Sequence, residues 1–202
     1  MNKKGGVKMN STNNEKTLEQ TADELVADTK HFIVDTFASM GTLGLEFKDE
    51  HGAHKGLNGN ISKAEQLYLN AGTKTAYEKI AKLYATGGKQ AFDVGYPEIT
   101  DRAIHRAISI YLYAGNELEA IALLNTYQDR PNISYTLLGN VARHKPLLTE
   151  YYCHKTNEAF ISAEIFPQFY ETIISIGKKL SDDWQKEHSA QVTNPWSDVL
   201  PK

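Results

Sequence analysis

The histidines of the segment DEHGAH come nearest, by residue type and spacing, to a metal site. His51 and His54 directly follow Asp49 and Glu50, and imidazole and carboxylate groups are ordinary ligands of zinc. Such a site needs further ligands held in a fixed frame, whereas this segment lies in a polar, glycine-rich stretch, 47–60. We therefore expect a mobile, solvated loop here and predict neither a metal ligand nor a cofactor.

A second candidate group lies around Cys153. His154 and Glu158 are four residues apart, as on one helix face, but ferritin-like metal sites use two Glu-x-x-His motifs and the sequence contains none. Cys153 as a nucleophile would need His154 or His144 as its base. Neighbouring side chains on a helix point about 100° apart, so His154 is badly placed. A surface ion pair and a buried structural thiol are favoured, and no catalytic residue is predicted.

Composition and charge exclude several classes of protein. The chain has 202 residues, 41% of them hydrophobic, a net charge of −3 and one cysteine. Its lysines and arginines form no block that would attract nucleic acid, and its apolar runs are far shorter than the roughly 20 residues that span a membrane. The basic start is not followed by the apolar run of a signal peptide, and the single cysteine suits a reducing compartment. We expect a cytoplasmic protein that binds no nucleic acid and has no membrane span.

Apolar residues recur at three- and four-residue spacing along most of the chain, which predicts an all-α fold. We expect a disordered tail at 1–15, one domain at 16–185, and a C-terminal tail at 186–202 on which Trp196 and Leu200 are the residues that would dock. We expect seven or so helices, from helical patterns that in chain order cover 18–40, 62–71, 74–86, 100–114, 116–128, 133–141, 146–152 and, on either side of Pro167, 160–166 and 169–180.

Local signals set the ends of these helices. Ser62 and Glu65 have the spacing of a capping box, and Asn116 and Glu119 repeat it.

Glycine and proline mark the other ends. The pair at 87–88 is expected to end the helix that begins at 74, with a loop at 89–99. Pro167 is expected to break or kink a helix that begins near Phe160.

One nine-residue pattern occurs twice, as AEQLYLNAG at 64–72 and as AISIYLYAG at 107–115. In each copy Ala, Leu or Ile, Tyr and Ala fall at i, i+3, i+4 and i+7, which is one helix face, and a glycine follows the helix end. The next helix starts within a few residues, so each copy should open an antiparallel hairpin. Since so short a hairpin cannot bury its own apolar face, we expect helical hairpins stacked as a short repeat, or else an irregular helical bundle.

The second copy resembles a tetratricopeptide repeat. Within YLYAGNELEA at 111–120, the Tyr, Gly and Ala of the family signature fall on Tyr111, Gly115 and Ala120. The resemblance covers about 70 residues, roughly 62–131, and includes a proline near the family's closing position.

The first copy departs from the family pattern. It keeps Tyr68 and Gly72 but has Tyr77 where the signature alanine belongs. The two copies begin at Ala64 and Ala107, 43 residues apart, whereas the family repeat has about 34 residues. An enlarged loop at 87–99 is expected to supply the difference.

The resemblance implies a protein-interaction adaptor or chaperone whose partner is another protein or a peptide. The chain is also similar, in its small size and mild acidity, to bacterial secretion chaperones of the tetratricopeptide type. Two other hypotheses are a secreted effector or regulatory protein, and a helical-bundle metal-binding protein or enzyme that uses the histidines above.

The resemblance also implies where a partner would bind, because the first helix of each pair builds the inner face of such repeats. With Gly72 and Gly115 as the turn glycines, Arg102 and His105 are an i, i+3 pair of donors for a carboxylate or a carbonyl. The alternative is that the apolar members of this face belong to the core. The predicted face consists of Gln66, Leu69, Asn70, Arg102, His105, Ser109, Leu112 and Tyr113.

Overall fold

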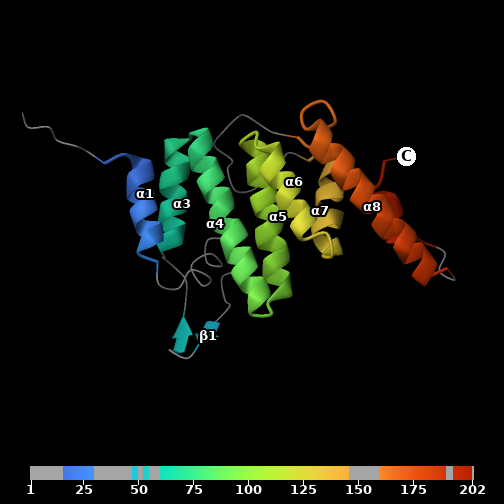
Figure 1. Cartoon of the computed structure of the whole chain (residues 1–202), viewed down its shortest axis with the longest axis horizontal. Helices are drawn as coiled ribbons and strands as arrows, with labels where there is room; N and C mark the ends of the chain where they lie inside the picture. Colours follow the sequence, from blue (N-terminus) through green and yellow to red (C-terminus); the bar gives the residue numbers. More distant parts are fainter. Residues whose placement is uncertain are drawn as a thin grey trace, which may run out of the picture.

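In the computed structural model, the helices lie side by side in chain order along the longest axis of the molecule (Figure 1). The structure describes residues 16–29, 47–49, 52–54, 60–145, 160–189 and 193–201. The helices are α1 (Leu18–Ala27), α3 (Asn60–Ala71), α4 (Lys74–Asp93), α5 (Pro97–Tyr113), α6 (Glu117–Thr126), α7 (Pro131–Ala142) and α8 (Pro167–Glu187), followed by the 3-10 helix η1 (Pro195–Asp198). The predicted all-α fold is confirmed.

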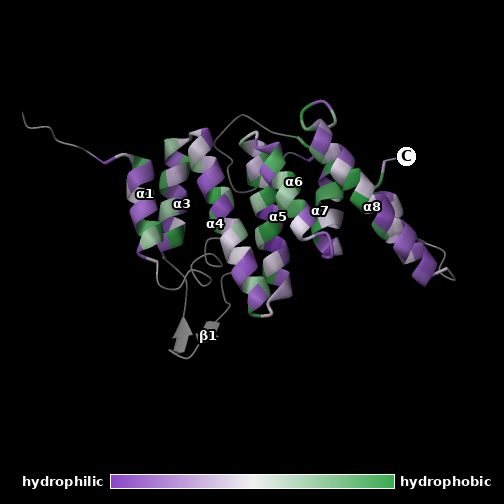
Figure 2. Cartoon of the chain, viewed as in Figure 1, coloured by the Kyte–Doolittle hydropathy of each residue, from purple (hydrophilic) through white to green (hydrophobic). Residues whose placement is uncertain are grey.

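Each helix packs mainly on helices close to it in the sequence, and the most extensive interface joins α4 to α5. Apolar and polar residues alternate along the helices (Figure 2), so that each can bury one side. One apolar cluster joins α1, α3 and α4 to α5, and a second joins α5 to α6, α7, α8 and η1. Helix α5 serves both, with Ile110 in the first and Ile108 in the second, and therefore links the two halves of the array.

Both copies of the repeated pattern end in the same local structure. Gly72 has φ 63° and Gly115 has φ 72°, the left-handed conformation in which a side chain is costly. The next residue caps the following helix: Thr73 and Asn116 each accept a hydrogen bond from the backbone amide three residues on, at 3.0 and 3.4 Å. The predicted hairpins α3–α4 and α5–α6 are therefore present.

The prediction that Gly87-Gly88 ends a helix is wrong, because α4 continues to Asp93. A Cβ added at Gly88 would lie 3.1 Å from the Cβ of Ala103 and 2.8 Å from Cδ1 of Ile104. Glycine thus lets α5 approach α4 closely, and packing outweighs its poor helix propensity.

The sequence distance between the two copies therefore comes from the length of α4 and not from a long loop. Helix α4 has 20 residues and α6 has 10. The chain turns at Gly95, whose φ is 83°, and α5 starts at Pro97 instead of Thr100, so most of the loop expected at 87–99 is helical.

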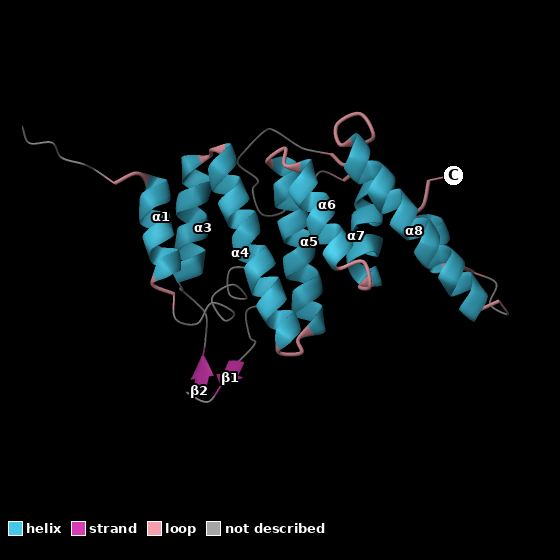
Figure 3. Cartoon of the chain, in the orientation of Figure 1, coloured by secondary structure: helices cyan, strands magenta, loops and turns pink. Residues whose placement is uncertain are grey.

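Two further predictions, for the start of α3 and for residues 47–54, are corrected. Helix α3 begins at Asn60, so Ser62 lies inside it and Glu65 is buried instead of completing a capping box. Residues 47–49 and 52–54, expected in a mobile loop, form the antiparallel strands β1 (Phe47–Asp49) and β2 (Gly52–His54), shown in magenta in Figure 3.

At the other end of the chain, residues 160–166 are not helical, and Pro167 begins α8 instead of kinking a helix, because proline suits the first helical turn. The segment expected to be a C-terminal tail contains η1, whose Trp196 is buried in the second apolar cluster, while Leu200 packs against it half-buried. The helix expected at 146–152, most of 28–46 and the tail at 1–15 lie outside the described residues. Within the described ranges, none of the helices is long and apolar enough to cross a membrane.

Candidate binding site

The face predicted for partner binding is only partly at the surface. Gln66, Asn70 and Arg102 are exposed, and the amide of Gln66 donates to the side-chain oxygen of Asn70 at 3.2 Å. Leu69 is half-buried against the first apolar cluster. What α3 and α5 present to solvent from this set is thus polar.

The central members of the predicted face belong to the interior. Leu112 has no exposed surface and lies in the second apolar cluster, and Ser109 is buried with its hydroxyl donating to the carbonyl of His105 at 3.0 Å. Tyr113 is half-buried, and its ring meets the buried ring of Tyr77 edge-on, 5.0 Å between centroids. Since buried side chains cannot contact a partner, Ser109 and Leu112 are removed from the face, and Tyr113 serves packing.

His105 does not act as a cationic donor beside Arg102. Burial, and after it the positive charge of the neighbouring Arg106, lower the pKa of His105 to about 4. Nε2 of His105 lies 3.4 Å from the side-chain nitrogen of Asn140 on α7. The ring is therefore neutral at neutral pH and accepts from Asn140 across the α5–α7 contact.

The tyrosine of the first repeated pattern has a structural role. The Tyr68 hydroxyl donates to Asp23 of α1 at 2.6 Å, and Nζ of Lys79 reaches the same carboxylate at 2.7 Å. Both hydrogen bonds lower the pKa of Asp23, and the bond from Lys79 has the larger effect. Together they hold α1 on the α3–α4 hairpin.

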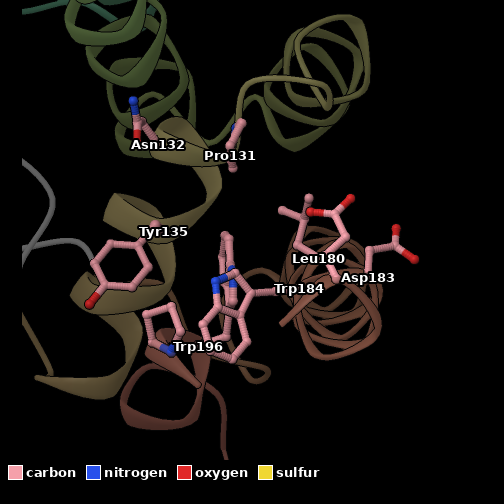
Figure 4. A pocket seen from close by; sticks show the side chains of 9 residues that line it. Pro131, Asn132, Tyr135, Leu180, Asp183, Trp184 and Trp196 are labelled. Atoms are coloured by element: carbon pink, nitrogen blue, oxygen red, sulfur yellow. The ribbon is translucent and has the colours of Figure 1, made fainter. Parts of the chain in front are cut away.

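A concave site within the described residues lies at the other end of the array, between α7, the C-terminal half of α8 and η1 (Figure 4). It is an open groove of about 490 Å³ whose walls are mostly apolar. Three aromatic rings come into it from three different elements. The lining residues are Pro131, Asn132, Tyr135, Leu180, Asp183, Trp184, Glu187, Pro195 and Trp196.

Helical spacing and one asparagine place these side chains. Leu180, Asp183, Trp184 and Glu187 are three or four residues apart and so share one face of α8. Asn194 fixes η1 on α8: its amide donates to the Ser181 hydroxyl at 2.7 Å, and its side-chain oxygen accepts from the backbone amide of Trp196 at 3.0 Å.

The rings of the groove are held by their neighbours. Tyr135 meets Trp196 edge-on at 5.5 Å, and its hydroxyl donates to Asp198 at 3.2 Å. Trp184 stacks on His188 with centroids 4.7 Å apart and planes 13° apart. Burial and the bond to Asp198 raise the pKa of Tyr135, so its hydroxyl stays protonated. The groove is thus formed without a partner.

The ionised side chains that line the groove are both acidic. Asp183 and Glu187 lie one helical turn apart on α8, both on the same flank of Trp184. Asp183 has an intrahelical partner in Lys186 at 3.2 Å, and the side chains of this pair are 49% and 75% exposed, so their mutual attraction is weak.

Sequence reasoning missed this groove, although it expected Trp196 to dock. The one available signal is that both tryptophans of the chain, Trp184 and Trp196, lie near its C-terminal end. The groove is assembled from residues 131 to 196, and neither periodicity nor spacing predicts that these segments meet.

No other chemical centre appears within the described part of the chain, where no three His, Cys, Asp or Glu side chains gather as metal ligands. His144 is exposed with φ 47° at the end of α7. The remaining candidates, or their side chains, lie outside the described residues: Asp49, Glu50, His51, His54, Cys153, His154 and Glu158.

No protein-family model, curated protein or solved structure matches this chain. The tetratricopeptide resemblance accordingly stays a prediction, and the groove is the feature of the described structure that points to a function.

Proposed function

We propose that this protein is an interaction adaptor or chaperone that binds a segment of another protein in the groove between α7, α8 and η1. The observation that carries the proposal is the meeting of Tyr135, Trp184 and Trp196 in one open groove. Tyrosine and tryptophan are enriched at the centres of protein interfaces because each supplies a large apolar area at little entropic cost.

The shape of the groove favours a chain segment over an enclosed small molecule. Its volume of about 490 Å³ lies in the usual range for binding pockets, but it is largely open to solvent. Tyr135 and Trp184 are only half-buried although they are large and partly apolar. A partner segment that covers them would remove that surface from water, which is the main favourable term in association.

The proposal does not depend on where in or outside the cell the protein acts. A cytoplasmic location, a role as a bacterial secretion chaperone, and the alternative of a secreted effector or regulator each stay a prediction. The proposal requires a groove-dependent protein partner in every one of these settings.

The test is quantitative affinity capture from the source organism with the wild-type chain and with groove variants. Trp184→Ala removes a central ring, and Glu187→Phe fills the rim from an exposed position without touching the core. We expect both to lose the same partner by at least about tenfold. Gln66→Ala, exposed on α3, is the control and should capture the partner normally.

Circular dichroism of each variant verifies the fold. If properly folded Trp184→Ala and Glu187→Phe capture everything that the wild type captures, the groove is not the binding site.

A further inference from the structure

Three rings elsewhere in this fold are covered by the chain's own cations. Three such pairs each place a Lys or Arg group within 6 Å of a ring centroid, the distance at which a cation is attracted to the π face. They are Lys79 over Tyr68 at 5.5 Å, Arg106 over Tyr84 at 4.7 Å and Arg130 over Phe92 at 5.8 Å.

The rings of the groove have no such cover from the described Lys and Arg side chains. Over the described ranges, no Lys or Arg lies above Tyr135, Trp184 or Trp196. One face of Trp184 is occupied by the stacked ring of His188, and the indole still lines the groove. The groove therefore offers aromatic surface to a cation that the described chain does not itself supply.

The rim has the charge that such a cation requires. Asp183 and Glu187 line the groove from one flank of Trp184 on α8, so a group above the indole would have two carboxylates along the same side. Lys186 already places its ammonium group 3.2 Å from Asp183, yet 75% of its side chain is exposed. An exposed pair of this kind is weak, so an incoming cation can displace Lys186 at little cost.

We propose that the partner segment inserts a lysine or arginine side chain, next to an apolar residue, between these rings and carboxylates. This inference rests on the proposed function and specifies its partner. The cationic head would meet the ring faces and the carboxylates, while Pro131, Leu180 and Pro195 would cover its methylene stem and the apolar neighbour. The two rim carboxylates would repel an acidic segment.

Intrinsic fluorescence reports this binding directly, because the two tryptophans of the chain both line the groove. The probes are three acetylated and amidated pentapeptides with the same leucines: LRLKL, LQLQL and LELEL. We expect LRLKL to bind at least about tenfold more tightly than the other two, and to weaken as salt is raised from about 50 to about 500 mM.

Variants on one helix assign the effect. The double substitution Asp183→Asn with Glu187→Gln should abolish the preference for LRLKL over LQLQL. Asp182→Asn is the matched control, since Asp182 is an exposed neighbour on α8 that does not line the groove. It should keep the full preference.

The outcomes separate this inference from the proposed function. If the three peptides bind equally, or if none binds, while capture of a cellular partner still depends on Trp184, the groove binds protein but the cationic inference is wrong. If L-argininamide alone binds as tightly as LRLKL, a protein segment is not what the site recognises. If capture of the cellular partner does not depend on Trp184, both the proposed function and the cationic inference are wrong.

Discussion

The hydroxyl of Tyr84 on α4 donates a hydrogen bond of 2.7 Å to the carboxylate of Glu65 on α3, and both side chains are buried. The guanidinium of Arg106, from α5, lies 4.7 Å from the centre of the Tyr84 ring. Three successive helices are therefore joined by polar contacts inside the first apolar cluster. A carboxylate in this position is costly unless it is hydrogen-bonded.

Tyr84→Phe removes this donor while keeping the ring. We expect the free energy of unfolding to fall by about 2 kcal/mol, because a hydrogen bond to a buried charged group is lost. Urea denaturation followed by circular dichroism measures the change. Tyr170→Phe on α8, whose hydroxyl has no such bond within the described residues, should change stability by less than about 0.5 kcal/mol. An unchanged midpoint for Tyr84→Phe would mean that Glu65 does not depend on this hydroxyl.

Two glycines inside helices should respond to alanine with opposite signs. At Gly88 a new Cβ would lie 3.1 Å from the Cβ of Ala103, and overpacking of about 2 kcal/mol should exceed the gain of about 1 kcal/mol in helix propensity. At Gly139 the nearest atom is Cγ1 of Val199 at 3.9 Å, an ordinary contact, so only the gain remains.

We therefore expect Gly88→Ala to lower the melting temperature and Gly139→Ala to raise it, each by a few degrees. Differential scanning calorimetry of both variants is the measurement. Stabilisation by Gly88→Ala would show that α5 is not as close to α4 as described here.

The predicted binding face yields a third pair of substitutions. Tyr113→Ala should reduce the free energy of unfolding by about 2 kcal/mol, because the ring packs edge-on against buried Tyr77. Arg102→Ala should leave it within about 0.5 kcal/mol, because Arg102 is exposed. Thermal unfolding of the two variants decides between a packing role and a surface role for Tyr113. If Tyr113→Ala is as stable as the wild type, the Tyr113 ring has a surface role and not a packing role.

Signals that act over one helical turn predicted the structure well. Gly72 and Gly115 end their helices in the left-handed conformation, and Asn116 caps α6, because these are backbone requirements of neighbouring residues. Contacts between distant residues overrode such signals elsewhere. Gly88 lies inside a helix because a side chain there would collide with α5. Glu65 points inward to Tyr84 instead of capping α3.

The groove was beyond prediction for the same reason. Tyr135 and Trp196 are far apart in the sequence and meet where Asn194 docks η1 on α8. A periodic pattern identifies the face that a helix buries but not which other element will cover it.

The neutral state of His105 makes stability depend on pH. Its pKa in the folded protein is about 4, below the usual value of about 6.5 in an unfolded chain. The unfolded state therefore binds more protons between these two values. The stabilisation from the neutral ring is complete above about pH 6.5 and is lost as the pH falls towards 4.

At pH 5 this loss should reach about 2 kcal/mol relative to pH 7, because the unfolded chain is mostly protonated at His105 while the folded chain is not. His105→Gln keeps a neutral side chain at every pH, so its free energy of unfolding should change less between pH 7 and pH 5 than that of the wild type. Urea titrations at the two pH values measure the difference. His144→Gln, at an exposed position, should retain the wild-type pH dependence. Equal pH dependence of His105→Gln and the wild type would show that the ring is charged in the folded protein and that the α5–α7 contact is not built on a neutral imidazole.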